Sequence, residues 1–135
     1  MEHPEARAWN RALKSMFDEI DDVLEDRYGG RYALHPNRPA RGKTSNKEMD
    51  GLFNVGADFT AGYGSDLGRG YVVQVRMSTL DHVPREVKAD IESDVEHLVR
   101  DKLRLTFPGR NLELRRDGSL LKIIGDFRLG SVIKE

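Results

Sequence analysis

The sequence feature that most constrains the fold is a long apolar stripe within the first 28 residues. Apolar residues recur there at steps of three and four, which is the spacing of one face of an α-helix. They are Trp9, Leu13, Met16, Phe17, Ile20, Leu24 and Tyr28. Pro4 suits the first turn of such a helix, and the Gly29-Gly30 pair suits its end. The pattern therefore predicts a helix over residues 4–28 that buries this stripe against another layer.

The opposite face of the same helix is acidic, and we expect it to be solvated. Its carboxylates belong to Asp18, Glu19, Asp21, Asp22, Glu25 and Asp26. Carboxylates spread along one solvated helix do not converge on a single ion, so this run predicts no metal site. The chain has no cysteine, which excludes disulfides and thiolate-bound metals. We expect no cofactor.

Alternation of apolar and polar residues predicts two strands in the middle of the chain, at 52–61 and 71–80. A glycine-rich stretch, residues 61–70, joins them, and we name it the glycine loop. We interpret it as the loop of a long hairpin between antiparallel strands.

The last third of the sequence predicts one helix and two strands. The helix begins at Pro84 and ends before Pro108-Gly109, with apolar residues again at helical spacing. Two apolar strands follow at 112–116 and 120–129. Asp117-Gly118 between them is a strong signal for a tight hairpin.

The order of these elements, α-β-β-α-β-β, predicts an α+β fold. An antiparallel four-stranded sheet with two helices packed on one face buries each apolar stripe once. The length of 135 residues predicts a single domain, residues 1–135. A long ordered segment, residues 29–51, follows the first helix, and we name it the connector.

Charge and hydropathy limit the functional classes. Charged residues make up 33% of the chain, but the formal net charge is only -1. A near-neutral balance gives no general argument for nucleic-acid binding. The amino-terminal residues lack the apolar run of a signal peptide, and no run approaches the roughly 18 residues that span a bilayer. We therefore expect a cytoplasmic protein with no membrane partner.

Two segments come close to nucleotide-binding motifs, and both fail on spacing. Arg41-Gly42-Lys43-Thr44 matches the end of a P-loop, but Asn37 stands where the first glycine is required. The glycine loop departs from G-x-G-x-x-G spacing at Gly68, and it leads into a strand rather than a helix. Neither segment therefore predicts a nucleotide-hydrolysing or dinucleotide-binding site, and we assign no catalytic residue.

The connector is basic, whereas the first helix is acidic. Residues 29–50 hold five bases and two acids, a local charge of +3, and residues 1–28 hold four bases and eight acids, a local charge of -4. Arg38, Arg41 and Lys43 could together bind phosphate, because arginine offers forked hydrogen bonds and lysine a point charge. The alternative is that the connector folds onto its own acidic helix.

The glycine loop supplies the other candidate ligand-binding residues, which are Tyr63, Ser65, Asp66 and Arg69. Dense glycine lets a backbone approach a ligand closely. The connector and the glycine loop flank one strand of about ten residues, which is some 33 Å long. The two segments meet only if the connector folds back along the sheet.

Three functions stay open. The first is a non-enzymatic binding module that contacts RNA, or another phosphate-bearing or acidic partner, through the connector and the glycine loop. The second is a small-molecule-binding protein or small enzyme with a pocket under the glycine loop, where His35 joins the candidate residues. The third is a structural homodimer that pairs through the sheet edge formed by 112–116 and 120–129.

Overall fold

The computed structural model describes residues 4–125 and confirms the predicted α+β fold. Two helices and a four-stranded antiparallel sheet follow one another in the predicted order. The elements are α1 (Pro4–Tyr28), the short 3₁₀ helix η1 (Lys47–Met49), β1 (Phe53–Thr60), β2 (Gly70–Met77), α2 (Arg85–Thr106), β3 (Leu112–Asp117) and β4 (Leu120–Gly125).

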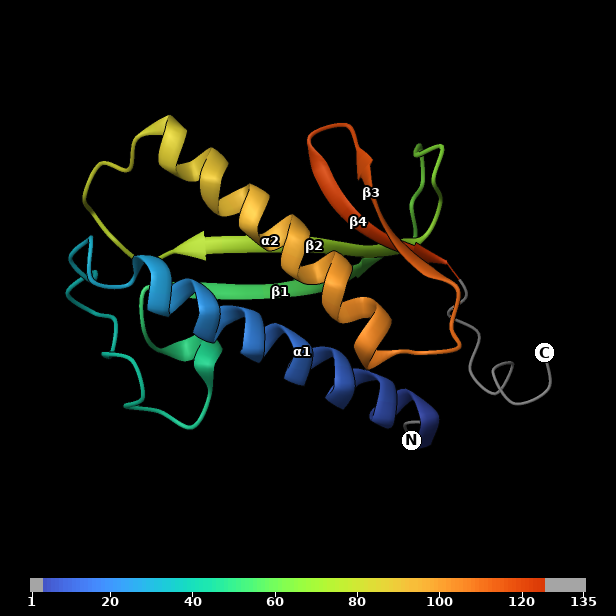
Figure 1. Cartoon of the computed structure of the whole chain (residues 1–135), viewed down its shortest axis with the longest axis horizontal. Coiled ribbons are helices and arrows are strands. Elements are labelled where there is room, and N and C mark those ends of the chain that lie inside the picture. Colours follow the sequence, from blue (N-terminus) through green and yellow to red (C-terminus); the bar gives the residue numbers. More distant parts are fainter. Residues whose placement is uncertain (1–3, 126–135) are drawn as a thin grey trace.

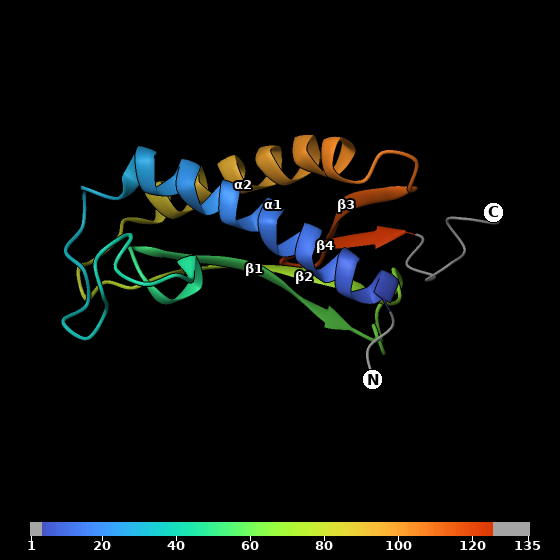
Figure 2. The same cartoon turned by 90° about the horizontal axis from the view of Figure 1, so that it is seen from below.

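The strands lie in the order β1-β2-β4-β3, and both helices cover one face of the sheet (Figures 1 and 2). The apolar stripe of α1 is buried as predicted, and Ile20 and Leu24 are fully inaccessible to solvent. Trp9 packs on Phe107 with ring centroids 4.4 Å apart, and its indole N–H donates to the Tyr71 hydroxyl. The core therefore fills the space between the two helices and the inner face of the sheet.

Two details of the strands differ from the sequence prediction. The tight turn between β3 and β4 consists of Gly118 and Ser119, one residue later than predicted, because Asp117 still pairs with Leu120. Gly118 has a φ of 65°, as a type II′ turn requires at its first central position. The fourth strand is described as far as Gly125, and residues 126–129 of the predicted strand lie outside the described residues.

The sheet is uneven, because β4 covers only part of β2. β2 pairs with β1 along all of its eight residues, from Gly70 to Met77. It pairs with β4 only through Tyr71, Val72 and Val73. Within residues 4–125, the stretch from Gln74 to Met77 therefore has a neighbouring strand on one side and an open edge on the other.

Candidate functional site

The connector is held by the start of β1 and by α1. The guanidinium of Arg38 donates to the main-chain carbonyls of Gly51 and Asp50 over 2.9 and 3.0 Å, and to that of Phe53 over 3.2 Å. Three of the five guanidinium N–H donors, those on Nε and Nη2, are therefore used to hold main-chain carbonyls. Arg38 therefore fixes the end of the connector where the sheet begins.

Other basic residues of the connector pair with the acidic face of α1. Arg41 lies 2.9 Å from Asp26 Oδ1 and 3.2 Å from Asp22 Oδ1, and Lys47 lies 2.8 Å from the same Asp22 oxygen. The hydrogen bond from Lys47 holds the pKa of Asp22 below its ordinary value. The connector thus folds onto its own helix, which is the alternative that the charge reversal left open.

This packing corrects one expectation about the acidic face. Asp21 and Glu25 were expected to be solvated, but they are only 3% and 7% exposed, because the end of the connector covers them. Glu25 Oε2 accepts a 2.9 Å hydrogen bond from the Phe53 N–H, whereas Asp21 Oδ2 has no partner in residues 4–125. Burial, followed by the nearby charges of Glu25 and Asp22, raises the pKa of Asp21 to about 7.

The glycine loop is fastened to β3 and β4 by a buried lysine. Lys122 is 2% exposed and donates to Gly68 O over 2.6 Å, to Asp117 Oδ2 over 2.9 Å and to Ser65 Oγ over 3.2 Å. Ser65 Oγ also donates to Asp117 Oδ2. All three ammonium protons are used, so the charged lysine acts as an anchor and not as a base for Ser65.

The structure does not bring the sequence-predicted site residues together. Figure 1 shows the connector at one end of β1 and the glycine loop at the other end. Arg38, Arg41 and the exposed Lys43 lie with the connector. Ser65 is anchored with the glycine loop, whereas Tyr63, Asp66 and Arg69 on the same loop are exposed.

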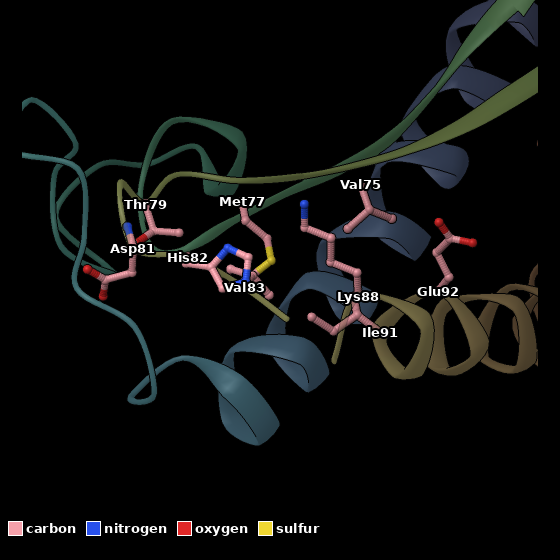
Figure 3. Close-up of a pocket in the computed structure, with 9 residues that line it drawn as sticks. All are labelled: Val75, Met77, Thr79, Asp81, His82, Val83, Lys88, Ile91 and Glu92. Carbon is pink, nitrogen blue, oxygen red and sulfur yellow. The ribbon is translucent and has the colours of Figure 1, made fainter. Parts of the chain in front are cut away.

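A cavity of about 420 Å³ lies between β2 and the beginning of α2 (Figure 3). Its apolar lining consists of Val75, Met77, Val83 and Ile91, and its polar lining of Thr79, Asp81, His82, Lys88 and Glu92. The cavity exists because β4 begins beside Val73 and covers no later residue of β2, which leaves the first turns of α2 over an incomplete sheet. This site could not be predicted from the sequence, because it depends on how far β4 pairs along β2.

The charged groups of the cavity differ in whether they have a hydrogen-bond or ion-pair partner within the protein. Asp81 Oδ2 accepts from the Ala33 N–H over 2.8 Å, and Glu92 lies 4.0 Å from Arg116. The side-chain ammonium of Lys88 has no hydrogen bond or ion pair with any residue between 4 and 125, whereas its main-chain N–H donates to Pro84 O over 3.1 Å. Its side chain extends from α2 toward β2, and in the view of Figure 3 its ammonium lies between the side chains of Met77 and Val75.

A second cavity, of about 200 Å³, continues the first along β2. The two share Val75 and Glu92, and the second reaches Val73, Leu120 and Leu121. Together they form a groove that follows β2 under α2, and we name it the β2 groove. One of its ends is marked by Thr79 and the other by the start of β4 at Leu120.

Two other kinds of site are not found in the part of the chain that the structure describes. No group of three or more histidine, aspartate or glutamate side chains in residues 4–125 could hold a metal ion. Neither α1 nor α2 is apolar enough over its length to cross a membrane.

Comparison with known proteins places the chain in a family. It is similar to an uncharacterised protein of Borreliella burgdorferi, with 44% identity over 109 residues, which cover 81% of this chain and 85% of that protein. No solved structure matches the chain. A family model described as "Uncharacterised protein" matches residues 4–125, which is the whole of the described fold. The chain therefore belongs to this uncharacterised protein family.

Proposed function

We propose that this protein is a non-enzymatic binding module that takes an acidic partner in the cavity between β2 and α2. The observation that carries the proposal is the ammonium of Lys88, which has no partner in residues 4–125 and extends over an apolar lining. A cation beside low-dielectric walls attracts an anion more strongly than one in open solvent. A carboxylate is the simplest group that fits this position.

The dimensions of the cavity also support ligand binding. Its volume of about 420 Å³ falls in the range of roughly 300–1,000 Å³ that is usual for ligand sites. Such sites combine mostly apolar walls with a few polar groups that orient the ligand. Val75, Met77, Val83 and Ile91 provide the apolar walls here, the other five lining residues are polar or charged, and among these Lys88 provides a positive charge that can orient an acid.

The geometry favours this cavity over the connector as the place where an anion binds. Arg38 and Arg41 already donate to carbonyl and carboxylate oxygens of the protein itself. An incoming phosphate would compete with these contacts. RNA contact through Lys43 and the glycine loop is therefore the competing outcome of the test.

A charge-reversal experiment separates the two sites. ¹⁵N-labelled protein is titrated with N-acetyl-valyl-glutamate, an acid with an apolar side chain, and separately with a 20-nucleotide oligouridylate. We expect the dipeptide to shift the amide signals of Met77 and Lys88, and Lys88→Glu to weaken its binding at least tenfold. The matched variant Lys43→Glu, also at an exposed lysine, should change the affinity less than twofold.

Three results would contradict the proposal. The first is dipeptide binding that Lys88→Glu leaves unchanged, and the second is no dipeptide binding at all. The third is tight oligouridylate binding that Lys43→Glu abolishes and Lys88→Glu does not, which would mean that the binding site includes the connector.

A further inference from the structure

The open edge of β2 carries main-chain groups that point away from β1, along the strand that lines the β2 groove. Ser78 N–H donates to Leu52 O over 2.8 Å, so Ser78 faces β1 in the hydrogen-bond ladder. The direction of these groups alternates along an antiparallel strand, and the register between β1 and β2 is continuous from Phe53 to Thr60. The N–H and C=O groups of Val75 and Met77 therefore point away from β1, to the side that β4 does not cover.

The β2 groove has the shape of a short strand. It follows β2 from Val73 to Thr79, a span of about 20 Å at the rise of an extended chain. That length fits about six residues. An extended peptide exposes main-chain donors and acceptors at the spacing that Val75 and Met77 offer.

We infer that the acidic partner is an extended peptide of about six residues, which adds as a strand to the open edge of β2. This inference rests on the proposed function and identifies its ligand. The main chain of the peptide pairs with Val75 and Met77, its apolar side chains contact Val83 and Ile91, and an acidic side chain reaches Lys88. Of the charges in the groove, only Lys88 lacks a partner in residues 4–125, so the peptide is acidic.

A free peptide fits the β2 groove better than a second copy of this chain does. β4 closes the groove at Leu120, and Thr79, His82 and Val83 line its other end. A second copy would offer β1, β3 or its own open β2 edge, and each of these belongs to a folded domain. A short segment without a folded domain attached needs no room beyond the groove.

Backbone methylation tests the inference. The probe is the hexapeptide acetyl-Val-Glu-Val-Glu-Val-Glu-amide, compared with two analogues that are N-methylated on either the three valines or the three glutamates. Only one alternating set of peptide N–H groups can face β2. We expect one analogue to bind at least tenfold more weakly than the parent and the other to lose less than about threefold. The Val75 and Met77 amides should become protected from hydrogen exchange when the parent peptide binds.

The outcomes separate this inference from the proposed function. If the dipeptide binds through Lys88 but the hexapeptide binds no tighter and neither methylated set matters, the strand inference is wrong and the proposed function stands. If neither acid shows binding that depends on Lys88, both are wrong. A dimer in light scattering, with Val75 and Met77 protected in the absence of peptide, would show that a second copy occupies the edge and would overturn the inference.

Discussion

The ammonium of Lys122 donates a 2.9 Å hydrogen bond to Asp117 Oδ2 beneath the glycine loop, and the same ammonium holds Gly68 O and Ser65 Oγ. One buried side chain from β4 thus joins the loop between β1 and β2 to the β3–β4 hairpin. This contact holds the glycine loop against β3 and β4. It also engages the Ser65 hydroxyl, which donates to Asp117 Oδ2 and accepts from Lys122.

Replacement of this anchor should destabilise the fold. We expect Lys122→Met to lower the free energy of unfolding by about 2–3 kcal/mol, because loss of a buried charged partner leaves polar groups unpaired. Lys102→Met, which removes a more exposed pair with Glu19, should cost less than about 1 kcal/mol. Urea unfolding measures both values, and equal losses in the two variants would contradict the anchor role of Lys122.

Two glycines of the loop offer a matched test of its packing. Gly62 and Gly64 have φ values of 78° and 81°, so alanine is strained at both positions. A Cβ at Gly62 would also lie 2.0 Å from Gly68 O, whereas at Gly64 it meets open space. We expect Gly64→Ala to lower the free energy of unfolding by about 1 kcal/mol and Gly62→Ala to lower it by at least twice as much. Thermal unfolding that ranks them in the reverse order would show that the loop packs differently.

Asp21 should make stability depend on pH. Its pKa is raised to about 7 from the ordinary value of 3.8, mainly by burial. Between these values the folded chain keeps a proton that the unfolded chain releases, so stability falls as pH rises from about 4 to about 7 and the contribution is lost above that range. Asp21→Asn cannot ionise. Relative to that of Asp21→Asn, the free energy of unfolding of the wild type should fall by about 2 kcal/mol between pH 5 and pH 8.

Urea unfolding at a series of pH values checks this expectation for Asp21. The difference between the two proteins should level off above pH 7. A constant difference across the whole pH range would mean that the Asp21 carboxyl ionises in the folded protein as it does in the unfolded chain.

Lys88 should contribute little to the stability of the free protein. It has no partner in residues 4–125, and it lies near the beginning of α2, where a negative charge is favourable to the helix dipole. A glutamate there would also repel Glu92, four residues later, by a few tenths of a kcal/mol. We expect Lys88→Glu to change the free energy of unfolding by less than about 0.5 kcal/mol. A much larger loss would indicate a structural role instead.

Much of the fold could be predicted from the sequence, because its determinants are local. The stripe from Trp9 to Tyr28 has the helical period over its whole length, and α1 forms over that length. The alternation in β1 likewise predicts which of its residues face the core. Phe59 departs from it, since the edge position of β1 leaves this side chain 58% exposed against Tyr71.

The candidate site could not be predicted, because its determinants are not local. Asp21 and Glu25 look like solvated helix residues until a distant segment covers them. Lys122 stands within an apolar run, and only its contact with the glycine loop shows why burial is tolerated. The β2 groove exists because β4 pairs with three residues of a longer β2, and the sequence does not reveal this register. The sequence signals were the connector and the glycine loop. In the structure Arg41 and Lys47 of the connector pair with α1, and Lys122 holds the glycine loop.

The measurement that tests the central claim most directly is hydrogen exchange at the open edge of β2. In the free protein the amides of Val75 and Met77 should exchange rapidly, whereas those of Gln74 and Arg76, which face β1, should be protected. Addition of the hexapeptide should slow Val75 and Met77 at least tenfold, and Lys88→Glu should abolish this effect. Val75 and Met77 amides that are already protected in the free protein, or that stay rapid at saturating peptide, would contradict the account.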